Sequence, residues 1–136
     1  MEAGLKWPND LVVDGVGKLS GVLTEVDGGA VVVGIGINVA WAPSGVGATC
    51  LGEGFTRDGV LSALLSALSG WLDVDDRAVL SAYRAACVTL GRDVRVELSD
   101  ETFVARAADV SDSGSLLVDT GACLREVSTA DVIHLR

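Results

Sequence analysis

The stretch KWPNDLVVDGVGKLSGVLTE, residues 6–25, together with the VDGGAVVVGIGINVAW that follows it, decides the fold of the first part of this chain. It contains three apolar runs, DLVV, KLSGVLTEV and AVVVGIGINVAW, which are separated by the glycine turns DGVG and DGG. Short turns of this kind connect antiparallel neighbours, so we expect a sheet of three antiparallel strands. The third run is almost continuously apolar, which predicts a strand that is covered on both faces.

Two polar side chains, Asn9 and Asp10, stand directly before the first apolar run. Pro8 fixes its own φ and stiffens the chain ahead of Leu11, so both side chains should be held at the start of the strand. Capping of a turn is the commonest use of such residues. The alternative is contact with phosphates and magnesium, because Mg²⁺ takes one or two carboxylates and completes its shell with water and substrate phosphates.

Lys18 is conspicuous because it and Lys6 are the only basic residues among the first 55. It is either a solvated lysine at a strand edge or a functional cation, with space left around it by Gly21. The glycines of GIGIN, residues 34–38, lie inside a strand, so they are a weak signal for dinucleotide binding. Strand glycines otherwise mark a bulge, packing against a helix, or a flat ligand ring on the backbone.

The second part of the chain changes its periodicity twice. Residues 41–55 are rich in glycine and serine and predict a loop, after which Thr56 can cap a helix that runs to about Leu72. A second helix is expected after DVDD, residues 73–76. From about Leu90, short alternating strands with glycine turns predict a small β-barrel.

Composition excludes several classes of function. The 136 residues carry a formal net charge of −9, which argues against binding to nucleic acid because that affinity depends on clustered Lys and Arg. The three cysteines are far apart and outside any C-x-x-C pattern, so they predict neither disulfides nor a zinc site, and a reducing cytoplasm fits best. The longest apolar run, residues 30–37, is too short to span a membrane. The single histidine, His134, is expected on the barrel surface rather than as a catalytic base.

Three segments in this order, KWPND, GKLSGVLTE and VVVGIGINV, closely resemble the central part of biotin–protein ligases, which adenylate biotin and pass it to a carrier lysine. YRAACVTLGRDVRVEL and the terminal VIHLR resemble that family's C-terminal SH3-like domain. The resemblance implies an α+β fold in which residues 1–89 form part of a class II synthetase-like biotin/lipoate ligase domain, an antiparallel or mixed sheet with helices. Residues 90–136 would form a small SH3-like β-barrel.

The resemblance also implies a site, with ATP and Mg²⁺ as cofactors and biotin as substrate. Lys18 would be the catalytic lysine, because a fixed ammonium offsets the negative charge that develops at the α-phosphate during adenylation. Asp10 would contact the metal. The residues implied to border biotin or the nucleotide are Trp7, Asn9, Asp10, Gly21, Gly34, Gly36, Asn38 and Arg136. We expect the barrel to bring Arg136 towards Lys18 and Asn38.

Two family features have no counterpart in these residues: the glycine- and arginine-rich loop that closes over biotin and its adenylate, and an N-terminal helix-turn-helix. We therefore expect the C-terminal half of a ligase, which needs its N-terminal half and is inactive alone. The implied partner is a biotin carboxyl carrier protein, a subunit of acetyl-CoA carboxylase. The alternative is a module that keeps a nucleotide or biotin pocket without turnover. A plain SH3-like interaction protein would leave residues 6–38 unexplained.

Overall fold

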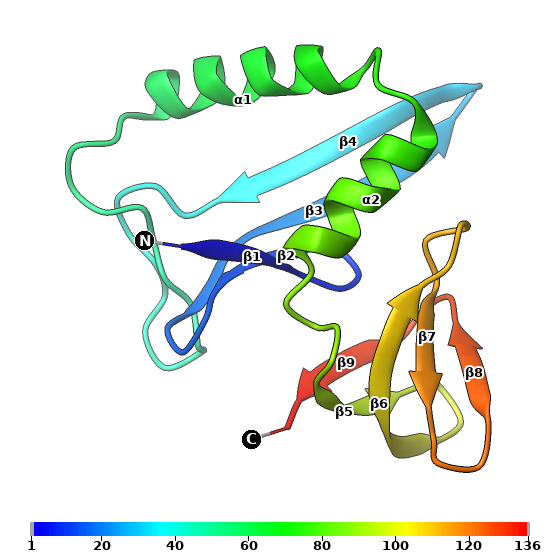
Figure 1. Ribbon diagram of the computed structural model, residues 1–136. Helices are drawn as coiled ribbons and strands as arrows, with labels where there is room; N and C mark the ends of the chain where they lie inside the picture. The colour runs from blue at the N-terminus through cyan, green and yellow to red at the C-terminus, as the bar shows by residue number, and fades with distance from the viewer. Residues whose placement is uncertain (1, 136) are drawn as a thin grey trace. The chain divides into compact units, whose positions relative to one another are not determined.

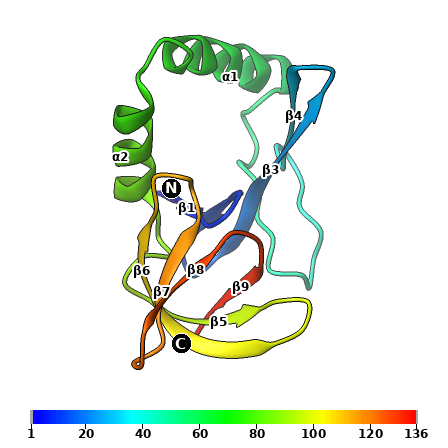
Figure 2. The same ribbon diagram turned by 90° about the vertical axis from the view of Figure 1, so that its right-hand side faces the viewer.

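The computed structural model describes residues 2–135, which separate into two compact units (Figures 1 and 2). The first unit comprises the chain up to Gly4 and Asn9–Val74, and the second comprises Leu5–Pro8 and the chain from Asp75 onward. The described residues contain two helices and two antiparallel sheets. The chain is therefore an α+β protein, as the sequence predicted.

The first sheet has four strands in the order β1-β2-β3-β4. These are β1 (Ala3–Lys6), β2 (Asp10–Val13), β3 (Gly17–Asp27) and β4 (Ala30–Ile37). The predicted antiparallel pairing through the two glycine turns is confirmed, since β2 pairs with β3 and β3 with β4. The turn end of the β3–β4 hairpin extends beyond β1 and β2 in both views (Figures 1 and 2).

The expectation that the third apolar run is covered on both faces is wrong. Val31, Val32 and Val33 are 63%, 54% and 48% exposed, although neighbouring residues of a strand point to opposite faces. The physical reason is that no layer of the described part of the first unit packs on these faces, since Leu23 and Val26 of the neighbouring strand β3 are 62% and 76% exposed as well. High apolar content predicted the strand correctly but did not predict what covers it.

The helix α1 (Arg57–Trp71) begins where the sequence predicted, with the Thr56 hydroxyl accepting a hydrogen bond from the Gly59 N–H at 3.2 Å. None of its fifteen residues, all of which the structure describes, is buried. Its apolar stripe is exposed at Leu61, Leu65, Leu68 and Trp71. Within residues 2–135, neither helix is long and apolar enough to cross a membrane.

The second unit is built on five strands in the order β8-β7-β6-β5-β9, all antiparallel. The strands are β5 (Asp93–Glu97), β6 (Thr102–Val110), β7 (Leu116–Asp119), β8 (Leu124–Val127) and β9 (Asp131–His134). The sheet is curved (Figure 1) but not closed into a barrel, because β8 and β9 remain its two edges. Helix α2 (Asp76–Ala86) packs Leu80 and Tyr83 against the core of this sheet.

Trp7 is a core residue of the second unit and is only 2% exposed. Its backbone N–H donates to the buried hydroxyl of Thr89 at 3.0 Å, and its indole Nε1–H donates to the Gly114 carbonyl at 2.9 Å. The Thr89 hydroxyl is also 3.0 Å from Nε2 of His134, a half-buried ring rather than a fully exposed one. Bonds across 82 and 107 sequence positions thus tie the Leu5–Pro8 segment to the second unit.

Candidate functional site

The predicted site has two cations, Lys18 and Arg136, and the structure describes only Lys18. Lys18 belongs to the first unit and lies close to Asp10. The Lys18 ammonium lies 2.6 Å from Oδ1 of Asp10, and the two side chains are 50% and 19% exposed. The turn between β2 and β3 and a register shift between Leu11 and Val12 set this approach. The ammonium is therefore held in one place while half of the side chain still faces solvent.

A row of glycines lies beside this ion pair. Asp10 pairs with Gly21 on β3, and Gly21 pairs with Gly36 on β4, so the three residues share one face of the sheet. A Cβ on Gly21 would lie 3.1 Å from the Lys18 ammonium and 3.3 Å from Oδ1 of Asp10. Gly36 has no atom within 4 Å of the place where a Cβ would stand. This face offers bare backbone next to a fixed charge.

Gly34 extends the same bare face, because it is two residues from Gly36 on the same strand. It pairs with Leu23, whose side chain is 62% exposed. A Cβ on Gly34 would meet only the Leu23 carbonyl oxygen, at 3.8 Å. The predicted residues Lys18, Asp10, Gly21, Gly34 and Gly36 are thus brought together on one face of β2–β4.

Asn38 follows β4 and fastens the loop after it to β3. Its Nδ2 donates to the Thr49 carbonyl at 2.9 Å and approaches the Lys18 carbonyl at 3.4 Å. The backbone of Lys18 bonds the same loop twice, donating to the Gly47 carbonyl at 2.7 Å and accepting from the Thr49 N–H at 2.8 Å. The sequence placed Asn38 near Lys18, but this use of its amide could not be seen from spacing alone.

Asn9 extends the pairing of β2 with β3. Its Nδ2 donates to the Val22 carbonyl at 2.7 Å, and its own carbonyl accepts from the Val22 N–H at 2.8 Å. The exposed side chain therefore supports the strand directly next to the glycine row. Of the other predicted residues, Trp7 lies in the core of the second unit, and Arg136 lies outside the described residues. Their assignment to the site stays a prediction.

The predicted contact with a metal ion is Asp10. Within residues 2–135 there is no group of three or more His, Cys, Asp or Glu side chains that could hold a metal ion. The one carboxylate at the site, that of Asp10, is already paired through Oδ1 with Lys18. The ion pair shows that Asp10 positions Lys18, and its contact with a metal stays a prediction.

Sequence reasoning missed a hollow of about 310 Å³ at the end of β4. It is lined by Asn38, by the exposed rings of Trp41 and Phe55, and by Arg57 at the start of α1. The signal was available, because two aromatic residues flank a glycine-rich loop that otherwise has few large side chains. The hollow adds aromatic faces and a second cation at the Asn38 end of the site.

Comparison with known proteins decides the family. Residues 89–135 match the family described as "Biotin protein ligase C terminal domain". The chain is 40% identical over 146 residues to the biotin--[acetyl-CoA-carboxylase] ligase of Mycobacterium tuberculosis, a match that covers 99% of this chain. The chain belongs to the biotin–protein ligase family. It corresponds to the C-terminal portion of these ligases.

Two further relatives support this assignment. The bifunctional ligase/repressor BirA of Bacillus subtilis is 26% identical over 97% of this chain. The biotin protein ligase from Aquifex aeolicus, solved in complex with biotin and ATP, superposes with a TM-score of 0.82 at 26% identity, covering 100% of this chain and 63% of that one. The chain spans 54% of the mycobacterial ligase and 46% of the Bacillus protein, so about half the length of these relatives.

Proposed function

We propose that this chain supplies part of the adenylation site of a biotin–protein ligase. In the proposed reaction a biotin carboxylate oxygen attacks the α-phosphorus of ATP, the bond to the bridging oxygen breaks, and pyrophosphate leaves. The amine of a lysine on a biotin carboxyl carrier protein then attacks the acyl carbon of biotinyl-AMP, forms an amide and releases AMP. The carrier would be a subunit of acetyl-CoA carboxylase, as the name of the mycobacterial relative suggests. Because the reaction consumes ATP and the three cysteines are free, we place it in the cytoplasm.

The observation that carries the proposal is the Lys18–Asp10 pair beside the glycine row. Negative charge grows on the α-phosphate during attack, and an ammonium that is already in place stabilises that charge without reorganising. The Asp10 carboxylate holds the Lys18 ammonium at the edge of the bare face, with 2.6 Å between Oδ1 of Asp10 and Nζ of Lys18. Asp10 is therefore a positioning residue in this proposal, and Lys18 is the catalytic one.

The bare face is the proposed floor for substrate. Open space above Gly36, and no more than the Leu23 carbonyl oxygen at van der Waals distance above Gly34, let a planar group lie against the backbone, which any side chain would prevent. The exposed Leu23 offers apolar surface on the same face. Asn38, and the hollow beside it with Trp41, would border the nucleotide at the far end of β4.

Magnesium would enter with the phosphates of ATP. Mg²⁺ bound in this way keeps several waters and needs only one or two protein carboxylates, so a contact to Asp10 is chemically sufficient. Since Oδ1 of Asp10 is engaged by Lys18, the proposal assigns no step of the reaction to that contact.

The test compares two lysines of the first 55 residues. The portion of the mycobacterial ligase that this chain does not span is fused ahead of it, and pyrophosphate release is measured in a single turnover with biotin and ATP. Lys18→Ala should slow release by about 10²–10³-fold, the usual effect of removing one preorganised donor. Lys6→Ala is the matched control and should leave the rate within a few fold. A thermal melt should change little for Lys18→Ala, because half-exposed ion pairs contribute only about 0–1 kcal/mol.

Near-normal release by folded Lys18→Ala would show that the lysine is misassigned. A fused protein that binds ATP and biotin in calorimetry but releases no pyrophosphate would favour the alternative, a binding module without turnover. The 136-residue chain alone should not biotinylate a carrier domain, because an open site admits water to the mixed anhydride. Robust turnover by the chain alone would contradict that expectation.

A further inference from the structure

The second unit contains a groove of about 400 Å³ that the proposed reaction does not use. This volume lies in the usual range for ligand pockets, roughly 300–1,000 Å³. One wall is α2, which contributes Val79 and Leu80, and another is the Trp7–Pro8 segment. The turn between β6 and β7 closes the groove with the backbone of Gly114. Most of its surface is therefore apolar.

The rim of the groove is acidic. Asp76, in the first turn of α2, and Asp112, in the β6–β7 turn, both line it. Within the part of the chain that the structure describes, no lysine, arginine or histidine lines the groove. The Asp112 side chain is 97% exposed, so its charge faces any molecule that enters from solvent.

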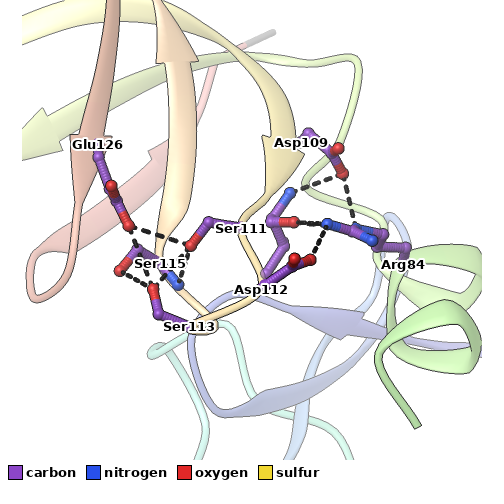
Figure 3. Close-up of polar contacts among 8 residues, drawn as sticks. Arg84, Asp109, Ser111, Asp112, Ser113, Ser115 and Glu126 are labelled. Atoms are coloured by element: carbon purple, nitrogen blue, oxygen red, sulfur yellow. Dashed lines mark hydrogen bonds and ion pairs between the residues drawn. The ribbon is translucent and has the colours of Figure 1, made fainter. Parts of the chain in front are cut away.

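One nearby cation, Arg84, does not neutralise this rim. Its guanidinium bonds the Val110 carbonyl and lies 3.0 Å from Oδ1 of Asp109, whereas Asp112 is more distant at 3.6 Å (Figure 3). One positive charge is thus shared between two carboxylates, and Asp76 adds a third negative charge. The local balance around the groove remains negative.

The β6–β7 turn that carries Asp112 is held in shape by hydroxyl groups. The Ser111 and Ser113 hydroxyls both donate to Oε1 of Glu126, at 3.0 and 3.1 Å (Figure 3). The Ser111 hydroxyl also accepts from the Ser115 N–H at 3.2 Å. A turn fixed in this way presents Asp112 without the entropic cost of ordering a loop on binding.

We propose that this groove binds a lysine side chain of a partner protein. The methylene stem of lysine covers apolar surface while its ammonium stays at a polar edge, which matches an apolar floor of Val79, Leu80 and Pro8 below an acidic rim. A purely apolar side chain would cover the floor of the groove but would gain no attraction from the negative rim, whereas an ammonium would. An acidic side chain would be repelled. All of these residues belong to the second unit, whereas the Lys18–Asp10 pair that carries the proposed adenylation belongs to the first.

The test uses the ¹⁵N-labelled 136-residue chain and three blocked tripeptides, Leu-Lys-Leu, Leu-norleucine-Leu and Leu-Glu-Leu. The indole N–H of Trp7, which bonds Gly114 in the groove wall, is the reporter resonance. The lysine peptide should shift this resonance in a saturable way. The norleucine peptide, which keeps the stem and loses the charge, should bind roughly tenfold more weakly or not at all, and the glutamate peptide should not bind.

Variants locate the interaction on the rim. Asp112→Asn and Asp76→Asn should each weaken the lysine peptide about threefold, in line with exposed ion pairs, and the double variant should weaken it about tenfold. Asp100→Asn is the matched control, because Asp100 is an exposed carboxylate of the β5–β6 turn in the same unit and lies outside the groove. Equal binding of the norleucine peptide, or an equal loss in Asp100→Asn, would overturn the proposal. So would an unchanged Trp7 resonance at saturating lysine peptide.

Discussion

Most strand valines are buried in the second unit, whereas those of β4 in the first unit are exposed. In the second unit Val94, Val96 and Val118 have no exposed surface, and they form one core with Leu116 and Trp7. In the first unit the valines of β4 are about half exposed, although their strand is more apolar than any strand of the second unit. The difference shows that hydrophobicity decides which element forms, whereas packing partners decide whether that element is buried.

The residues of the proposed adenylation site belong to the first unit, in which fewer side chains are buried. Among the described residues of the first unit, the buried side chains are Val13, Leu19 and Ser20, which lie next to the Lys18–Asp10 pair. The apolar stripe of α1 and the faces of β4 remain exposed around them. The second unit, by contrast, is stabilised by its own core and by the bonds of Trp7 to Thr89 and Gly114.

The largest expected effect tests this contrast with two identical substitutions. Leu116→Ala removes a fully buried side chain from the second unit and should cost about 2–5 kcal/mol of unfolding free energy. Leu23→Ala removes a side chain that is 62% exposed and should cost no more than roughly 0.5 kcal/mol. Urea titrations followed by residue-resolved NMR would report each unit separately. Equal costs would mean that the exposed face of β3–β4 is covered in solution.

A smaller effect distinguishes two glycines within the first unit. Gly17 has φ of 150°, and a Cβ there would lie 2.3 Å from the Gly47 carbonyl oxygen, so Gly17→Ala must displace the loop that Lys18 bonds. We expect a loss of about 1–3 kcal/mol, the usual cost of local strain. Gly36→Ala meets open space and should leave stability nearly unchanged while it weakens nucleotide binding in the fused enzyme.

Thermal melts and ATP calorimetry on both glycine variants would check this prediction. The informative outcome is a reversal, in which Gly36→Ala unfolds easily and still binds ATP normally. That result would show that the bare face serves packing rather than substrate.

The smallest expected effect concerns Glu126 in the second unit. Hydrogen bonds from Ser111, Ser115 and Ser113 lower the pKa of its carboxyl group below the ordinary 4.5. A carboxyl whose pKa is depressed by folding stabilises the folded state above its unfolded pKa, and this contribution is lost as the pH falls through the folded pKa. The carbon resonance of the Glu126 carboxyl should titrate below the usual range. Ser111→Ala should move the midpoint upward, and an unchanged midpoint would show that the hydroxyl bonds are absent in solution.

Much of the local structure followed from neighbouring residues. The glycine turns predicted both hairpins of β2–β4, and Thr56 predicted the start of α1. The same short-range pattern placed Asp10, Lys18 and the strand glycines close enough to form a site, because antiparallel strands joined by short turns have little freedom of register. The motifs KWPND, GKLSGVLTE and VVVGIGINV were also sufficient to predict the family that the comparisons confirm.

Only the tertiary structure decided burial and side-chain partners. Trp7 stands beside Asn9 in sequence, yet its bonds to Thr89 and Gly114 place it in the core of the second unit. The amide of Asn38 bonds the Thr49 carbonyl in the following loop, and the acidic groove combines α2 with a turn more than twenty residues away. Turns, caps and strand propensity depend on residues that are adjacent in the chain, so sequence alone determined them. Burial, hydrogen-bond partners and local charge depend on residues brought together from distant positions, and no short-range pattern contains that information.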